Sequence, residues 1–358
     1  MLLQENIPLA PLTTLKIGGL ARYFVAAKDT AEVQEAVAWA QSNNLPLFVL
    51  GGGSNLLIAD AGWPGLVLKV AIQGFERSAT ENNGKVLFEV GAGEAWDRFV
   101  SEAVRARCAG IECLSGIPGS VGGTPVQNVG AYGQEVSETI ASVQVLDLQD
   151  GQVRTLTPAD CKFGYRSSIF NTTQCGQFIV LRVTYGLTSD GDPRIIYMDL
   201  KRHFNGWETT PNLAEVREAV RHIRALKGML IVPGDPDCQS AGSFFKNPVL
   251  SEEQHAALKT RAAARGLSLP SYPALESRKK VSAAWLVEHS GFAKGFGYGR
   301  VAISSKHALA IVNRGGATAA EVLALKEQIQ HRVEEIWGVR LEPEPVMVGF
   351  QASLPSAS

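Results

Sequence analysis

Two glycine-rich segments constrain this 358-residue chain more than any other feature of its sequence. The first, Gly51 to Asn55, follows an apolar run typical of a buried strand, and the second holds four glycines between Gly116 and Gly123. Glycine loses more conformational freedom on folding than any other residue, so such clusters indicate sharp turns or close backbone approach. Unshielded backbone N–H groups can cradle a phosphate, whereas an ordinary tight turn is the alternative interpretation.

The glycine spacing excludes two common nucleotide-binding motifs. It matches neither the Gly-x-Gly-x-x-Gly of a nicotinamide-binding Rossmann domain nor the P-loop, which also needs Lys-Ser/Thr. Two phosphate-binding loops in one globular domain predict a large, nucleotide-type ligand.

Composition excludes several other classes of protein. A formal net charge of −1, with 34 basic and 35 acidic residues and no long runs of either, gives no footprint for nucleic acid or a membrane surface. No stretch approaches the roughly 20 apolar residues of a membrane span, and residues 1–12 lack a signal-peptide pattern. We therefore expect a cytoplasmic monomer. The five cysteines form no Cys-x-x-Cys pair and the six histidines show no ligand spacing, so no metal site is predicted.

Local signals predict alternating strands and helices before residue 190 and mostly helices after it. A capping box at Asp29 to Glu32 predicts a helix with Val33, Val37 and Ala40 on one face, and a second helix is expected over 96–107. Asp150-Gly151 predicts a hairpin. Later helix starts are expected at Asn212, Ser251, Ser282 and Thr318, and a Pro/Gly/Asp-rich link over 232–238 indicates a domain boundary. The tail from Gln351 to Ser358 is expected to fray.

Three further features could carry chemistry. Ser243 stands between Gly242 and two phenylalanines, lacks the context of a hydrolase nucleophile, and is better suited to donating a proton, although a turn or cap serine is the alternative. Arg166 follows Tyr165 and could clamp a carboxylate or phosphate, or only stack on that ring. Glu344 lies in a stiff Glu-Pro-Glu segment that would fix its direction, whereas solvated charge is the commoner outcome.

These features, taken in order, resemble the UDP-N-acetylenolpyruvoylglucosamine reductase (MurB) family over nearly the whole chain. The matching segments are Thr14 to Gly19, Ala21 to Phe24, Gly51 to Asn55, Gly116 to Gly119, Asn128 to Gly133, Phe163 to Ser168, Ala241 to Phe245 and Leu341 to Glu344.

The resemblance implies an α+β fold: a two-subdomain FAD-binding fold of the vanillyl-alcohol-oxidase type plus a third, substrate-binding α+β domain. It implies a first FAD subdomain at 1–71, joined by a C-terminal strand at 341–358, a second at 72–227, and the substrate domain at 228–340.

The resemblance also implies an FAD enzyme that uses NADPH to reduce the enolpyruvyl ether of a UDP-sugar during peptidoglycan precursor synthesis. Hydride would pass from flavin N5 to C3 of the enol ether, and Ser243 would give a proton to C2. Arg166 matches the family's cation near the developing charge, and Glu344 matches its third catalytic residue. A buried, protonated Glu344 could polarise the substrate carboxylate.

The remaining residues implied by the resemblance fall into two groups. The cofactor-binding residues are Gly51, Gly52, Gly53, Ser54, Asn55, Gly116, Ile117, Pro118, Gly119, Gly122, Gly123, Thr124 and Asn128. The substrate- or NADPH-binding residues are Tyr165, Tyr197, Arg224, Lys227, Asn247 and Tyr272. Two alternatives stay open: another flavin-dependent oxidase or dehydrogenase of this fold, and a non-catalytic flavin or nucleotide-sugar binding protein.

Overall fold

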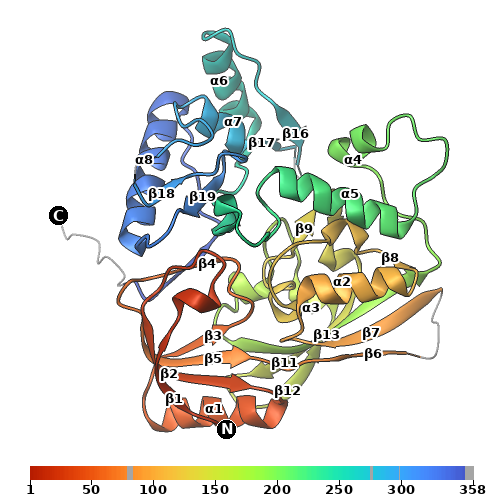
Figure 1. Cartoon of the computed structure of the whole chain (residues 1–358), viewed down its shortest axis with the longest axis vertical. Helices are drawn as coiled ribbons and strands as arrows, with labels where there is room; N and C mark the ends of the chain where they lie inside the picture. The colour runs from red at the N-terminus through yellow and green to blue at the C-terminus, as the bar shows by residue number, and fades with distance from the viewer. Residues whose placement is uncertain (79–83, 275–276, 298, 351–358) are drawn as a thin grey trace. The chain divides into compact units, whose positions relative to one another are not determined.

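A computed structural model describes residues 1–78, 84–274, 277–297 and 299–350 (Figure 1). The predicted frayed tail lies outside the described residues. The chain forms two compact units, and it passes from the first to the second for the last time after Leu226. Unit 1 comprises Met1–Ile7, Ala21–Gly53 and Trp63–Leu226, and unit 2 comprises Pro8–Leu20, Ser54–Gly62 and the chain from Lys227. The three-part division expected from the resemblance stays a prediction.

A four-stranded sheet with three parallel strands forms the first layer of unit 1. Its strand order is β1 (Gln4–Pro8), β2 (Leu20–Ala27), β5 (Trp63–Val70) and β3 (Leu47–Leu50), and β5 runs parallel to both β2 and β3. Helix α1 (Thr30–Ser42) connects β2 to β3. The predicted cap is confirmed, because the Asp29 side chain accepts the Glu32 N–H at 2.8 Å. The expected apolar face of α1 is buried.

An antiparallel sheet forms the second layer of unit 1. Its order is β12 (Val153–Leu156), β11 (Ile140–Asp147), β13 (Phe178–Ser189), β7 (Lys85–Gly91) and β6 (Phe75–Arg77), with β8 (Cys108–Ala109) paired to β13. The predicted hairpin joins β11 to β12, and Gly151 adopts the left-handed φ of +72° that the turn requires. A short helix, α3 (Pro158–Cys161), follows.

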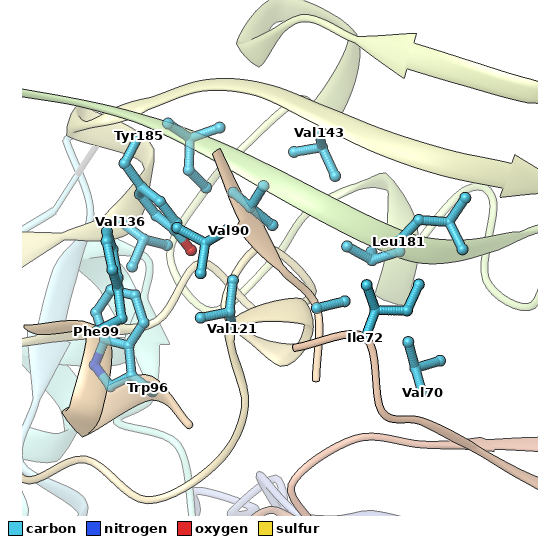
Figure 2. Packing of buried hydrophobic residues seen from close by; sticks show 14 of the residues in the cluster. Val70, Ile72, Val90, Trp96, Phe99, Val121, Val136, Val143, Leu181 and Tyr185 are labelled. Atoms are coloured by element: carbon cyan, nitrogen blue, oxygen red, sulfur yellow. The ribbon is translucent and has the colours of Figure 1, made fainter. Parts of the chain in front are cut away.

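Three aromatic side chains, Trp96, Phe99 and Tyr185, lie among aliphatic ones in the core that packs this sheet against helix α2 (Trp96–Arg105), as Figure 2 shows. The Phe99 ring centroid lies 5.1 Å from that of Tyr185 and 5.9 Å from that of Trp96. The two polar atoms in this cluster are satisfied. Trp96 Nε1 donates to Leu114 O at 3.0 Å, and the Tyr185 hydroxyl bonds the Thr124 hydroxyl at 2.6 Å.

Two helices complete unit 1. Helix α5 (Leu213–Leu226) starts at the predicted cap, where Asn212 Oδ1 accepts the Ala214 and Glu215 N–H groups. Helix α4 (Met198–His203) was not predicted and packs on α5 through Leu200.

Unit 2 contains two small antiparallel sheets and three helices. One sheet has the order β14 (Ser240–Ser243), β19 (Ala310–Asn313), β18 (Val301–Ile303), and the other has β15 (Val249–Leu250), β17 (Lys279–Val281), β16 (Ser271–Pro273). The helices are α6 (Glu252–Ala263), α7 (Ala283–Glu288) and α8 (Ala319–Trp337), and their predicted caps at Ser251, Ser282 and Thr318 are confirmed. No helix in the described ranges is long and apolar enough to cross a membrane.

Segments from both ends of the chain meet in unit 2. Strand β20 (Val346–Val348) pairs in parallel with β4 (Leu56–Ile58). The Asp60 carboxylate accepts the Ala319 and Ala320 N–H groups at 2.8 and 3.1 Å, so it satisfies the first turn of α8.

The buried hydroxyl pair provides a test of the unit 1 core. Thr124 donates to Val121 O, so Tyr185 is the donor in the shared bond. We expect Tyr185→Phe to lower the free energy of unfolding by about 1 kcal/mol, because Thr124 loses a buried partner. Urea unfolding followed by circular dichroism measures the change.

Tyr23→Phe is the matched control, because Tyr23 is partly exposed and its ring contact with Trp39 at 5.1 Å would remain. We expect a change within about 0.5 kcal/mol there. Equal effects in the two variants would contradict the assigned role of the hydroxyl pair.

Candidate active site

The two glycine loops of unit 1 meet backbone to backbone. A Cβ atom on Gly52 would lie 2.4 Å from Gly119 Cα and 2.5 Å from Ser120 N. These distances are far below van der Waals contact, so the loops can approach in this way only because residue 52 has no side chain. Because residue 52 has no Cβ, the backbone groups of the paired loops are unshielded at this position.

Neighbouring backbone bonds hold the second loop in shape. Trp96 N donates to Gly119 O at 3.1 Å, and Val121 N donates to Glu94 O at 2.9 Å. Gly122 N donates to Ala92 O at 2.8 Å, and a Cβ on Gly122 would lie 2.6 Å from Ala92 Cβ. The loop is therefore fixed against the start of α2.

Ser120 is a candidate that sequence reasoning missed. Its hydroxyl is buried and has no hydrogen-bond partner among the described residues, and it lies 3.0 Å from where a Cβ of Gly51 would stand. A buried hydroxyl without a partner is costly unless a ligand satisfies it. Together with the glycine contact, it fits a cofactor that carries phosphate groups, such as FAD. Its position inside the loop between Gly119 and Gly122 was the available sequence signal.

Several predicted cofactor residues occupy other places. Ser54 and Asn55 belong to unit 2, where Asn55 Nδ2 donates to Glu344 O at 3.2 Å. Thr124 is buried against Tyr185, whereas Gly123 is exposed and Ile117 and Pro118 are half-buried. Their contact with a cofactor stays a prediction.

Arg166 stands at the tip of a tight turn. Gly164 and Ser167 exchange two backbone hydrogen bonds, and Arg166 adopts a left-handed φ of +54° between them. Its Nη2 donates to Gly130 O at 2.9 Å, and its guanidinium lies 5.5 Å from the Tyr165 ring centroid. The arginine therefore stacks on Tyr165, as one interpretation of the motif expected, and is also fixed by a hydrogen bond to a backbone carbonyl. Its clamping of a carboxylate or phosphate stays a prediction.

Asn128 ties this turn to the adjacent hairpin of β9 (Gly130–Ala131) and β10 (Gln134–Glu135). Its Nδ2 donates to Glu135 Oε2 at 2.8 Å and to Gly164 O at 3.0 Å, and its Oδ1 accepts the Ser137 N–H at 3.1 Å. The side chain is thus fully engaged within unit 1. Cofactor binding by Asn128 stays a prediction.

Two predicted substrate residues of unit 1 are Arg224, which bonds the second glycine loop, and Tyr197, which contacts Tyr132. Arg224 Nε donates to Gly116 O at 3.1 Å, and Arg224 also bonds Tyr132. Burial lowers the pKa of Arg224, although Tyr132 and Asp97 oppose this effect. The Tyr132 ring in turn contacts the ring of Tyr197 at 5.4 Å.

Cys113, which precedes the second loop, is a buried, hydrogen-bonded thiol. Its Sγ donates to Arg194 O at 3.2 Å, and burial raises the pKa of the thiol far above its usual range, with Glu112 adding to the effect. The thiol therefore stays protonated and has a structural role.

Hydrogen bonds in unit 2 pair the segments that carry Ser243 and Glu344, although these two residues are 101 positions apart in the chain. Lys246 N donates to Glu342 O and Glu344 N donates to Phe244 O, both at 2.9 Å. Phe244 and Phe245 are buried in the core of unit 2, so they anchor the segment that carries Ser243. Ser243 and Glu344 are both half-buried, whereas the Glu342 side chain is 77% exposed.

The other predicted substrate residues of unit 2 are Asn247, Tyr272 and Lys227. Asn247 Oδ1 accepts the Ala283 N–H at 2.9 Å, which fixes the amide. Tyr272 lies on β16 with 57% of its surface exposed, and Lys227 is the first residue after α5. The combination of the two units' residues into one site stays a prediction.

Two family models match the chain. The model of an FAD binding domain matches residues 21–157, and that of the C-terminal domain of UDP-N-acetylenolpyruvoylglucosamine reductase matches residues 235–348. The mixed helices and strands confirm the expected α+β fold class, and the matches confirm an FAD-binding domain followed by a further domain. FAD is therefore the cofactor, and the protein is an FAD-dependent oxidoreductase.

Similar proteins extend over almost the whole chain. UDP-N-acetylenolpyruvoylglucosamine reductases of Streptomyces coelicolor and Thermobifida fusca are 45% and 44% identical to it, over 96% of this chain and 90% and 98% of theirs. The crystal structure of the Thermus caldophilus enzyme has a TM-score of 0.65 and 28% identity, covering 97% of this chain and all of that one. The chain belongs to the UDP-N-acetylenolpyruvoylglucosamine reductase (MurB) family.

Proposed function

We propose that the protein reduces UDP-N-acetylenolpyruvoylglucosamine to UDP-N-acetylmuramate with NADPH as the hydride donor, in peptidoglycan precursor synthesis. The names of its relatives support the substrate and the reaction. The observation that carries the proposal is the pairing of the segments around Phe244 and Glu344, because these two segments hold the hydroxyl and the carboxylate that the reaction would use. A cytoplasmic location and a monomeric state remain part of the proposal.

FAD, held by the two glycine loops and the Ser120 hydroxyl, would supply the redox chemistry by accepting a hydride from NADPH and delivering it to C3 of the enolpyruvyl group. The protein has to stabilise the negative charge that this delivery creates and supply the proton that completes the reduction.

Arg166 would stabilise the negative charge. Addition of hydride at C3 leaves an anion at C2 that spreads into the adjoining carboxylate, and a preorganised cation there typically lowers the barrier by about 3–4 kcal/mol. The bond from Arg166 Nη2 to Gly130 O and the tight turn beneath it limit the positions of the guanidinium. Little reorganisation is then needed as charge develops.

Ser243 would give its proton to C2, and Glu344 would act at the substrate carboxylate. The pairing of their segments keeps both side chains on a rigid frame, and the buried phenylalanines hold that frame in the core. Asn247 and Tyr272 of unit 2, with Lys227, and Tyr165, Tyr197 and Arg224 of unit 1 would bind the UDP-sugar or NADPH. Arg224 and Lys227 suit the diphosphate group of such a ligand.

An anaerobic visible spectrum tests the whole function. NADPH should bleach the flavin band, and the enolpyruvyl UDP-sugar should restore it, since each addition drives one half-reaction. A bound flavin that NADPH leaves oxidised would favour an oxidase of the same fold, and a flavin that the sugar fails to reoxidise would contradict the proposed substrate.

Ser243→Ala tests the proton donor. We expect NADPH to bleach the flavin as before, whereas reoxidation by the sugar slows by about 10²- to 10⁴-fold because C2 lacks its acid. Stopped-flow spectroscopy measures both steps. Ser251→Ala, which removes the α6 cap bond to Gln254 N, is the control and should cost about 1 kcal/mol of stability without slowing either step. Unchanged reoxidation in Ser243→Ala would assign the proton to another group.

Gly52→Ala tests the cofactor loops. The new Cβ would collide with Gly119 and Ser120 backbone atoms, and overpacking of this kind costs about 1–3 kcal/mol. Because the strain displaces the loops that would hold FAD, we expect FAD affinity to fall by about 5- to 140-fold. Titration of apoprotein with FAD, followed by flavin fluorescence, gives the dissociation constant. Gly186→Ala is the matched control, because its Cβ would come no closer than 3.4 Å to its neighbours. Wild-type affinity in Gly52→Ala would place FAD elsewhere.

A further inference from the structure

One face of helix α5 points toward the second glycine loop. Arg217, Arg221 and Arg224 follow one another at spacings of four and three residues, so they share a face of the helix. Helices α5 and α2 lie next to each other in unit 1 (Figure 1). The three guanidinium groups all bond either the loop itself or Asp97, a residue in the first turn of α2.

Asp97 is the centre of this arrangement. Its carboxylate accepts Arg217 Nη1 and Nη2 at 2.6 and 2.9 Å, Arg221 Nη1 at 2.8 Å, and the Gly116 N–H at 2.6 Å. Burial opposes its ionisation, but the bonds from Arg217 and Gly116 outweigh that effect and lower the pKa of Asp97. The group is therefore a carboxylate at neutral pH.

Both peptide groups of Gly116 are hydrogen-bonded to side chains. Its N–H bonds Asp97 and its carbonyl accepts Arg224 Nε at 3.1 Å, while its φ of +70° lies in the left-handed region. The loop that meets Gly52 thus begins at a residue fixed from α2 on one side and from α5 on the other.

Two different effects on a bound anion follow from these residues. One carboxylate and three guanidinium groups give the cluster a net charge of +2 (three minus one), which would attract a diphosphate even without any bracing. Rigid placement of the loop would instead help by presenting its backbone groups without a cost of ordering. Replacement of Asp97 separates the two effects because it raises the positive charge while removing the brace.

We propose that Asp97 is a positioning residue for FAD: through Gly116 and the α5 arginines it fixes the second glycine loop, a role that rests on the proposed FAD function of that loop. Bracing, rather than charge, is its contribution to FAD affinity. The carboxylate itself would repel a diphosphate, so attraction of the ligand does not explain its presence there.

The test is the FAD dissociation constant of the Asp97→Asn apoprotein. Asparagine has nearly the same shape and can still accept the Gly116 N–H, but it cannot hold two guanidinium groups. We expect FAD to bind about tenfold more weakly or worse, despite the increase in local positive charge. If electrostatic attraction were the main effect, affinity would stay equal or improve, and that result would overturn the proposal.

Asp97→Glu keeps the charge and moves the carboxylate by one methylene. Bracing predicts weaker FAD binding here also, whereas a charge effect predicts no change. Asp150→Asn is the matched control: it removes one carboxylate from the exposed ion pair with Arg154 at the β11–β12 hairpin of the same unit, and FAD affinity should not change.

Two further measurements separate positioning from loss of structure. Thermal melting of each apoprotein reports its fold, and kcat at saturating FAD should return to the wild-type value, because the brace affects occupancy of the loop and not the reacting atoms. A kcat that stays low at saturating FAD, or a loss of affinity that only follows unfolding of the apoprotein, would overturn the proposal. A wild-type protein that binds FAD but fails to reduce the sugar would refute the proposed reaction and leave these affinities interpretable.

Discussion

The close approach of Gly52 to Gly119 is the constraint on which unit 1 depends. Gly52 follows the end of β3 in the parallel sheet, whereas the Gly119 loop is held at the start of α2, whose aromatic face covers the antiparallel sheet. The contact of the two loops therefore joins the two layers, and it exists only because neither loop carries a side chain at that point. The same property that lets the layers join leaves backbone groups open to a ligand.

Local sequence signals predicted the helices well because a cap needs only residues that are adjacent in the chain. The capping residues Asp29, Asn212, Ser251 and Thr318 each begin a helix as expected. Helix α4 escaped prediction because the residue before it, Tyr197, makes no side-chain cap bond and the helix has only six residues. The pairing of β4 with β20 was beyond local signals, since strand pairing at long range is set by tertiary packing.

The candidate site was predictable in its residue types and not in its contacts. Glycine composition alone indicated the two loops, and local chemistry singled out Ser243, Arg166 and Glu344, but resemblance to a family was needed to assign their roles. Ser120 and Asp97 were missed because a serine inside a glycine loop and an acidic residue in a first helical turn both have ordinary explanations. Local signals also gave no indication that the Asn128 side chain bonds Glu135, Ser137 and the Arg166 turn, because these partners are set by tertiary packing.

Unit 2 is assembled from three separate stretches of chain, two of them near the beginning. During synthesis on the ribosome, Leu56–Ile58 emerges long before its strand partner Val346–Val348. Asp60 likewise emerges long before the first turn of α8, whose N–H groups it accepts. The nascent chain must therefore carry an apolar strand edge without its partner until residues 346–348 have been made, and exposed edges favour aggregation. Unit 1 has no such delay, because its last segment, Trp63–Leu226, has been made before the last segment of unit 2 begins at Lys227.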